Sequence, residues 1–212
     1  MAQQAQIDEL TAKMTEERGK LLSVLEAMSE ERASTPPKPG EWNQKQQMSH
    51  LCEMESAYRA WVERALEEDG ANVDGVLGER PAIPLEKANE RPLGDHIAEL
   101  RRQREMTMQM ISRMSPADFD RTATNRLFGT LTAMQWLRSY YRHDRMHYDQ
   151  VRGEEPATSL STPGARNRIS DGDRAHREAQ GLRHAPPTGP GARISRGALR
   201  RGAVGRGGAP AG

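Results

Sequence analysis

Apolar residues recur at helical spacing in four separate stretches of the first 152 residues, and this repeat constrains the fold more than any other feature of the sequence. In the first stretch, from about residue 7 to residue 31, the apolar positions form one stripe along a helix. The members of this stripe are Ile7, Leu10, Met14, Leu21, Leu25 and Met28. Residues 36–40, which include three Pro and one Gly, then end the helical pattern.

The second predicted helix begins at Asn43, a residue type favoured at the helix N-cap, and Gln46 three positions later completes the pattern of a capping box. One face of this helix carries a Glu among apolar residues, and its members are Leu51, Glu55, Tyr58, Val62 and Leu66. Asp69 and Gly70 end the helix. Residues 71–91 contain scattered Gly and Pro, so we expect a long crossover loop there.

The third and fourth predicted helices cover about residues 95–114 and 132–151. The apolar stripe of the third helix contains one charged residue, Arg104, which is unusual for a buried face. Thr132 fits the N-cap of the fourth helix, and Gly153 follows its last turn, where helices commonly end.

These stretches predict an all-α fold, because no segment shows the alternation of apolar and polar residues that is typical of a strand. Four helices that each carry one apolar stripe can bury those stripes only against each other. We therefore expect a four-helix bundle over residues 1–152. The long connection between the second and third helices indicates that the bundle is not a simple up-down-up-down arrangement.

Residues 153–212 have a different composition, dominated by Gly, Pro, Arg and Ala, and are expected to form a disordered tail. Ten of the 31 Lys and Arg residues and five of the 30 Asp and Glu residues fall in this tail, which gives it a net charge of +5. The bundle itself then carries −4, so it is not expected to bind nucleic acid. The basic tail could make weak, salt-sensitive contact with nucleic acid or an anionic surface.

Cys52 is the single cysteine, so no intramolecular disulfide can form, as is typical of a protein from the reducing cytoplasm. No apolar run approaches the ~20 residues that a membrane-spanning helix requires. The first residues are polar and acidic, unlike a secretory signal peptide. We therefore expect a cytoplasmic protein with no membrane partner.

His143 and His147 lie four residues apart, so a helix places both side chains on one face. This spacing alone is weak evidence for a metal site, since two partly exposed His on a charged helix would look the same. His50 stands about two turns into the second helix. If the second and fourth helices are antiparallel, all three imidazoles lie at one height and could hold one divalent metal ion.

Three neutral imidazoles suit Zn, Ni or Fe, and three protein ligands leave positions open for water or for a thiol. Four neighbouring side chains could orient a ligand or line the pocket, although each also fits an ordinary surface, core or ion-pair role: Glu53, Tyr140, Asp144 and Arg104. His96, near the start of the third helix, is expected to be exposed or to cap that helix.

The chain resembles the DinB/YfiT-like proteins in two separated segments. The second-helix signature of that family, a Trp followed by a His, an apolar residue and an acidic residue, resembles the segment EWNQKQQMSHLCEMESAY. The fourth-helix signature, H-D-x-x-H followed by a Gln, resembles the segment LTAMQWLRSYYRHDRMHYDQV. The order and spacing of both segments match over roughly residues 7–152, and the tail departs from the family pattern.

This resemblance implies an up-down-down-up bundle with metal ligands at His50, His143 and His147. It also implies a small-molecule substrate, because family members include thiol-dependent S-transferases, isomerases and amidohydrolase-like enzymes. A low-molecular-weight thiol is then a candidate cofactor, and a homodimer is expected because dimers are common in the family. A metal-dependent hydrolase or thiol transferase is the leading hypothesis. The alternative is a bundle that binds a metal or a small ligand without catalysis.

Overall fold

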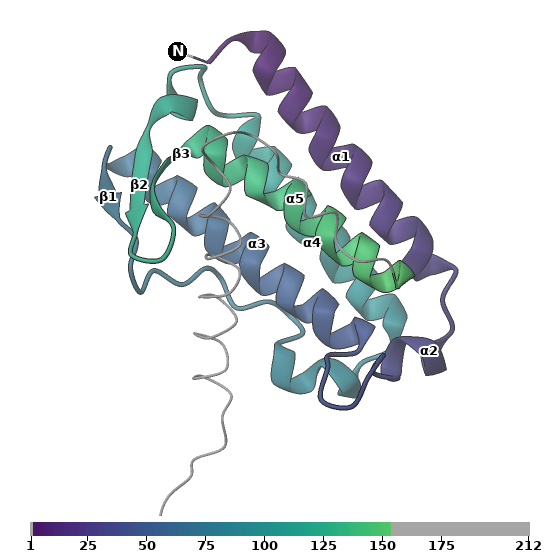
Figure 1. Ribbon diagram of the computed structural model, residues 1–212. Helices are drawn as coiled ribbons and strands as arrows, with labels where there is room; N and C mark the ends of the chain where they lie inside the picture. Colours follow the sequence, from purple (N-terminus) through teal and green to yellow (C-terminus); the bar gives the residue numbers. More distant parts are fainter. Residues whose placement is uncertain (1, 154–212) are drawn as a thin grey trace, which may run out of the picture.

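The computed structural model describes residues 2–153, and four long helices make up most of this part of the chain (Figure 1). The long helices are α1 (Gln4–Glu26), α3 (Gln44–Glu67), α4 (Leu93–Ile111) and α5 (Ala133–Arg152). Each lies within a few residues of a stretch that the apolar repeat predicts. The tail, whose disorder is predicted above, lies outside the described residues beyond Gly153.

Helices α1 and α5 run in one direction, and α3 and α4 run in the other (Figure 1). Contacts between α1 and α4 show their antiparallel order. Arg18 donates a hydrogen bond to the carbonyl oxygen of Leu100. Arg104, one turn later on α4, donates to the carbonyl oxygen of Met14, one turn earlier on α1. The predicted four-helix bundle with up-down-down-up topology is therefore confirmed.

The helix ends use the capping residues that the sequence indicates. The Asn43 side chain accepts a hydrogen bond from the backbone N–H of Gln46, whose side chain accepts from Asn43 in return. Thr132 and Gln135 form the same reciprocal pair at the start of α5. Gly153 closes α5 with φ of 75°, a left-handed conformation that favours glycine. These caps fix where the two histidine-bearing helices begin.

The first helix ends earlier than predicted. Helix α1 stops at Glu26, and a short helix α2 (Glu30–Ser34) follows, whereas the apolar stripe predicts one helix to about residue 31. The reason is Ser29, whose side chain accepts a hydrogen bond from the backbone N–H of Arg32 and so caps a new helix. Met28 continues the apolar stripe beyond Glu26, and for this reason the sequence predicts a longer first helix.

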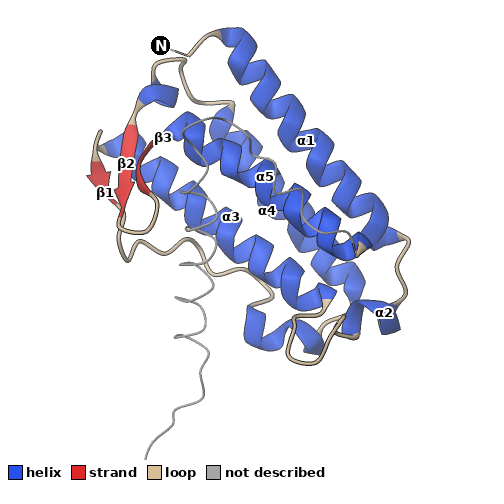
Figure 2. Cartoon of the chain, viewed as in Figure 1, coloured by secondary structure: helices blue, strands red, loops and turns tan. Residues whose placement is uncertain are grey.

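The prediction that the chain forms no strand is wrong, because a small three-stranded sheet closes one end of the bundle (Figure 2). The shorter elements are β1 (Ala71–Asn72), η1 (Leu85–Glu90), η2 (Asp118–Asp120), β2 (Thr122–Asn125) and β3 (Gly129–Thr132). Strand β2 lies between the other two, parallel to β1 and antiparallel to β3, with Thr122 opposite Thr132. Strands of two to four residues are too short for alternation to be visible in the sequence.

Part of the predicted crossover loop is a strap held against α3. The indole Nε1 of Trp61 donates to the carbonyl oxygen of Val76, at 2.9 Å. Ser56 Oγ donates to the carbonyl oxygen of Glu79, at 2.7 Å. Between these bonds, Gly78 lies so close to α3 that a Cβ atom would stand 2.3 Å from the backbone of Ser56. Only glycine allows this approach.

The core has two apolar halves. One half, near the sheet, is rich in aromatic residues and includes Met14, Tyr58, Trp61, Phe119, Trp136 and Tyr140. The other half is aliphatic and includes Leu21, Leu25, Leu51, Leu100 and Val151. Both halves draw on all four long helices, so the change from one half to the other falls within the length of these helices.

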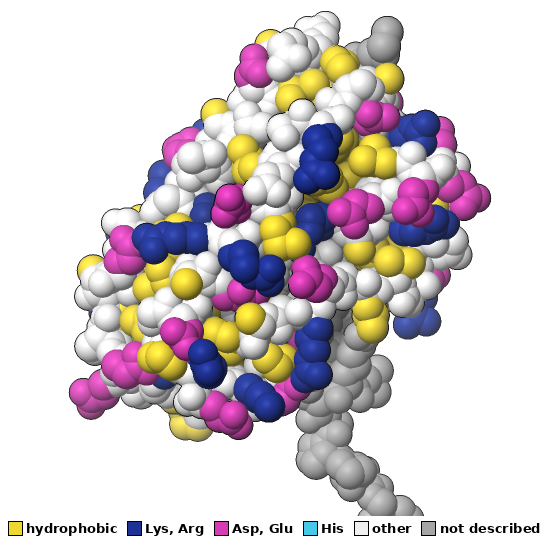
Figure 3. All heavy atoms as spheres, turned by 180° about the vertical axis from the view of Figure 1, so that it is seen from behind, with side chains coloured by type: hydrophobic (Ala, Val, Ile, Leu, Met, Phe, Trp, Pro, Cys, Tyr) yellow, Lys and Arg dark blue, Asp and Glu magenta, His cyan; other side chains and the backbone are white. Residues whose placement is uncertain are grey.

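Basic, acidic and apolar side chains are interspersed over the face opposite to that of Figure 1, and no histidine is visible there (Figure 3). None of the described helices combines the length and the apolar character needed to cross a membrane.

Candidate metal centre

The structure brings together the three histidines that the sequence singles out. His50 projects from α3, and His143 and His147 project from α5. One nitrogen atom from each ring lies within 4.8 Å of the others. The three meet because α3 and α5 are antiparallel, as the sequence argument requires. We call these residues the three-His group.

The closest pair within the three-His group is His143 and His147, whose Nε2 atoms are 3.1 Å apart. The ring of His50 faces them edge-on, with centroids 5.0 Å from His143 and 5.6 Å from His147. Two nitrogens bound to one ion at about 2.1 Å lie roughly 3.4 Å apart in a tetrahedral site. The nitrogens of the three-His group are therefore close enough together to hold one divalent metal ion.

Burial keeps His147 in the form that a metal ligand needs. Removal from water lowers the pKa of the His147 imidazole to about 4, although the charge of Asp144 and a hydrogen bond to Gln150 oppose this shift. The ring is therefore neutral at pH 7 and carries one nitrogen lone pair. His143 is only half-buried, so solvent reaches the three-His group from its side.

Gln47 and Trp42, which precede His50 in the chain, also contact residues of the three-His group. Gln47 Oε1 lies 3.2 Å from His147 Nδ1, and Gln47 Nε2 donates to the carbonyl oxygen of Trp42, also at 3.2 Å. The Trp42 ring packs against His50, with centroids 5.2 Å apart. Nothing in the sequence indicated this role for Gln47, because only the antiparallel packing brings the start of α3 beside the end of α5.

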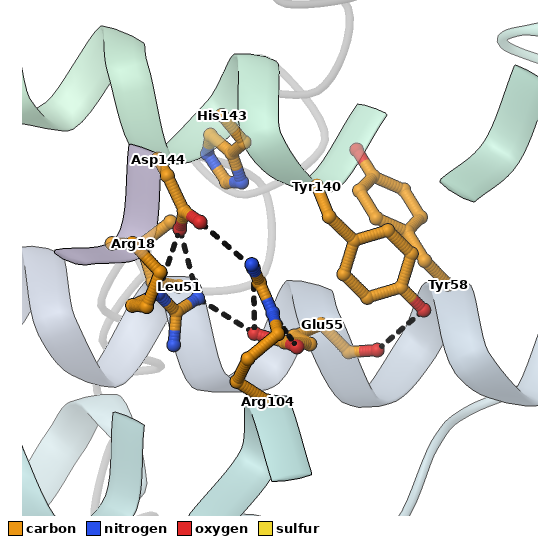
Figure 4. A pocket seen from close by; sticks show the side chains of 8 residues that line it. All are labelled: Arg18, Leu51, Glu55, Tyr58, Arg104, Tyr140, His143 and Asp144. Atoms are coloured by element: carbon orange, nitrogen blue, oxygen red, sulfur yellow. Dashed lines mark hydrogen bonds and ion pairs between the residues drawn. The ribbon is translucent and has the colours of Figure 1, made fainter. Parts of the chain in front are cut away.

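A second cluster, which we call the charged layer, lies next to the three-His group and consists of Arg18, Glu55, Arg104 and Asp144 (Figure 4). Each of the four long helices supplies one member. Arg18 Nη2 lies 2.7 Å from Glu55 Oε2 and 2.8 Å from Asp144 Oδ1. Arg104 lies 2.8 Å from both carboxylates, through Nε to Glu55 and through Nη2 to Asp144. The layer separates the two apolar halves of the core.

The neighbouring charges of the layer favour the ionised forms of Glu55 and Arg18. Burial alone would raise the pKa of Glu55, but the nearby Arg104 and Arg18 charges and a hydrogen bond from Thr107 lower it to about 2. Burial also opposes the charged form of Arg18, yet the charges of Asp144 and Glu55 raise the pKa of its guanidinium above the ordinary value. Buried charges persist only with such partners.

The structure shows which groups Asp144 and Arg104 contact. Asp144 forms ion pairs, but it is 0% exposed rather than solvated. Arg104 does bind carboxylates, those of the charged layer, and does not reach out to water. Arg18 and Glu55 were missed as partners. The available signal was that both stand within apolar stripes, as Arg104 does.

Tyr140 and Glu53 differ in their surroundings. Tyr140 is buried, and its hydroxyl donates to the carbonyl oxygen of Glu55 at 3.2 Å, which is a packing role. Burial raises the pKa of this phenol well above its ordinary value. Its ring also lines a cavity of about 10 Å³ together with His143 and the charged layer (Figure 4). Glu53 is half-buried on α3, and its role beside the metal site stays a prediction.

Two other candidate residues have structural roles. His96 is 1% exposed, so the expectation of an exposed or capping residue is wrong. Its Nε2 lies 2.9 Å from the carbonyl oxygen of Ala88, which ties α4 to η1. Cys52 is buried in the aliphatic half of the core, where removal from water raises the pKa of its thiol. Cys52 is not among the donors of the three-His group.

The fold and the site together define a class: four-helix bundles of up-down-down-up topology with a three-His group between two antiparallel helices. Comparison with protein-family models identifies the family within this class. Residues 13–151 match the model of the DinB superfamily, which is more than half of the chain. The chain belongs to the DinB superfamily.

Solved structures give the same fold at low sequence identity. YfiT from Bacillus subtilis, described as a probable metal-dependent hydrolase with an unusual four-helix bundle topology, is 18% identical, with a TM-score of 0.61 over 72% of this chain and 87% of that chain. TT2238, described as a four-helix bundle protein, is 21% identical, with a TM-score of 0.52 over 70% and 99% of the two chains. A comparison with curated protein sequences finds no match.

Proposed function

We propose that this protein is a divalent-metal-dependent enzyme of hydrolase or thiol S-transferase type. The observation that carries the proposal is the three-His group, whose ring nitrogens lie within 4.8 Å of one another. Three imidazoles and no carboxylate suit Zn, Ni or Fe. Membership of the DinB superfamily and the likeness to a probable metal-dependent hydrolase support the same class of activity.

In this proposal His50, His143 and His147 hold the ion and leave coordination positions for water or for a low-molecular-weight thiol. A bound divalent metal would lower the pKa of that water or thiol and so supply a nucleophile near neutral pH. The half-buried side of His143 is where a small-molecule substrate would approach.

The first test is elemental analysis of the purified full chain. We expect about one divalent ion per wild-type chain and loss of that ion in His147→Ala. His96→Gln is the matched control, because it alters a buried histidine that contacts Ala88 and is not a member of the three-His group. Metal retained in His147→Ala, or none bound by the wild type under metal-replete conditions, would rule the proposal out.

The second test concerns catalysis. A panel of electrophiles and hydrolysable amides is assayed with and without low-molecular-weight thiols. Turnover should disappear on chelation and return with added Zn, Ni or Fe. A dependence on thiol separates the transferase from the hydrolase.

One observation favours the alternative of a metal-binding bundle without catalysis. The cavity beside His143 holds only about 10 Å³, and much of its wall is the ion-paired charged layer. This volume is close to that of a single water molecule. A substrate would therefore have to bind on the solvent side of His143. Stoichiometric metal without turnover on the whole panel would support this alternative.

A homodimer would appear as twice the chain mass in light scattering.

A further inference from the structure

We infer that Gln47 is a positioning residue for the metal site, because its side-chain oxygen fixes which nitrogen of His147 carries the proton. The role of Gln47 in metal binding rests on the proposed function. The proton position itself can be measured without any metal. Three contacts support the inference, from Trp42 to Gln47, from Gln47 to His147, and from His147 to His143.

The first contact fixes the orientation of the Gln47 amide. The carbonyl oxygen of Trp42 can only accept a hydrogen bond, and the nearest amide atom of Gln47 lies 3.2 Å from it. If the amide were turned over, two oxygen atoms would face each other at this distance. The NH₂ group therefore faces Trp42, and the amide oxygen Oε1 faces His147.

The second contact fixes the proton on the imidazole. Gln47 Oε1 is an acceptor and lies 3.2 Å from His147 Nδ1, so Nδ1 must carry the hydrogen. A neutral imidazole has only one N–H group. Nε2 of His147 is then left with its lone pair, which is the form that binds a metal.

The third contact shows where this lone pair points. His147 Nε2 lies 3.1 Å from His143 Nε2, inside the three-His group. Gln47 is 8% exposed and His147 is 4% exposed, so water is poorly placed to replace the amide oxygen. Loss of such an outer partner typically weakens metal binding by about 10–100-fold.

Gln150 is the competing partner, because it also forms a hydrogen bond to His147. It stands three residues later on α5 and is half-buried. The two glutamines offer the same chemical group to the same ring from different helices. A pair of matched substitutions, one at each position, therefore separates their roles.

The test reads the tautomer of His147 by long-range ¹H–¹⁵N NMR on the full chain after removal of metal. At pH 8 an ordinary histidine, with a pKa of about 6.5, is neutral. We expect the Nδ1–H form in the wild type, in Gln47→Glu and in Gln150→Met. We expect a shift toward the Nε2–H form in Gln47→Met, which keeps the length of the side chain but removes the acceptor.

A second readout is zinc affinity, measured by competition with a chelator. Gln47→Met should bind Zn²⁺ about 10–100-fold more weakly than the wild type, and Gln47→Glu should restore the affinity. The inference is overturned by an Nε2–H tautomer in the wild type, by an unchanged tautomer in Gln47→Met, or by a shift caused by Gln150→Met alone. If Gln47→Met does not fold, the wild-type and Gln47→Glu spectra decide. Absence of zinc binding by the wild type would defeat the proposed function and leave the tautomer result standing.

Discussion

The charged layer and the three-His group lie side by side on α3 and α5, yet they are built in opposite ways. In the charged layer two guanidinium groups face two carboxylates, and each carboxylate oxygen accepts a hydrogen bond from a guanidinium group. In the three-His group three rings of the same kind face one another. The first cluster pairs opposite charges within the chain, whereas the second brings together nitrogen donors that can bind a cation. The comparison separates a structural device from a ligand site.

The largest effect should come from breaking the charged layer. Arg104→Met leaves Glu55 and Asp144 with one guanidinium between them, so we expect a loss of about 3–5 kcal/mol in the free energy of unfolding. Urea unfolding followed by circular dichroism measures it. Arg101→Met, an exposed residue on the same helix, is the control and should cost less than about 1 kcal/mol. Equal losses from both variants would mean that the layer does not stabilise the fold.

Acid should act on the same layer. The folded pKa of Glu55, about 2, lies below its ordinary value of 4.5, so its ionisation stabilises the fold above pH 4.5. That contribution, on the order of 3 kcal/mol, is lost as the pH falls from about 4.5 to about 2. Glu55→Gln should flatten the pH dependence of unfolding in this window. An unchanged acid slope in the variant would argue against the paired state of Glu55.

Metal should act on the three-His group and not on the charged layer. At a free Zn²⁺ concentration 100 times the dissociation constant, binding stabilises the fold by about 2.7 kcal/mol. We expect this gain in the wild type and in Arg104→Met, but not in His147→Ala. Thermal unfolding with and without zinc measures it. A gain that survives in His147→Ala, or that vanishes in Arg104→Met, would mean that the two clusters are not separate.

The smallest effect concerns the start of α5, which carries residues of both clusters. Thr132→Ala removes the N-cap acceptor and should cost about 1 kcal/mol in unfolding free energy. Metal content per chain should stay as in the wild type, because the cap lies roughly three to four turns from the histidines of α5. Elemental analysis of the variant checks this, and a loss of metal would show that the cap positions the site.

Much of this arrangement could be predicted from the sequence, because local spacing determines it. The helices followed from the apolar repeat, and the meeting of the three histidines followed from the i, i+4 pair together with antiparallel packing. The charged layer was seen only in part. Arg104 stood out within a stripe, but its partners Glu55 and Arg18 lie on two other helices, and one helix does not reveal what another brings to it.

The remaining errors have separate causes. The strands were missed because each pairs only two to four residues, and β1 meets β2 from about fifty residues away in the sequence. His96 was expected at the surface, because its position near a helix start gave no sign that η1 would cover it. Non-local coverage of this kind cannot be read from periodicity.

The direct passage from β3 into α5 has a consequence for the tolerance of the chain to insertions. Thr132 is both the last residue of the strand and the cap of the helix, so no slack separates them. One residue inserted there would rotate everything downstream by about 100° around the helix axis. His143 and His147 would then turn away from His50. The β2–β3 hairpin at one end of the molecule thus sets the direction in which His143 and His147 project near the other end of α5.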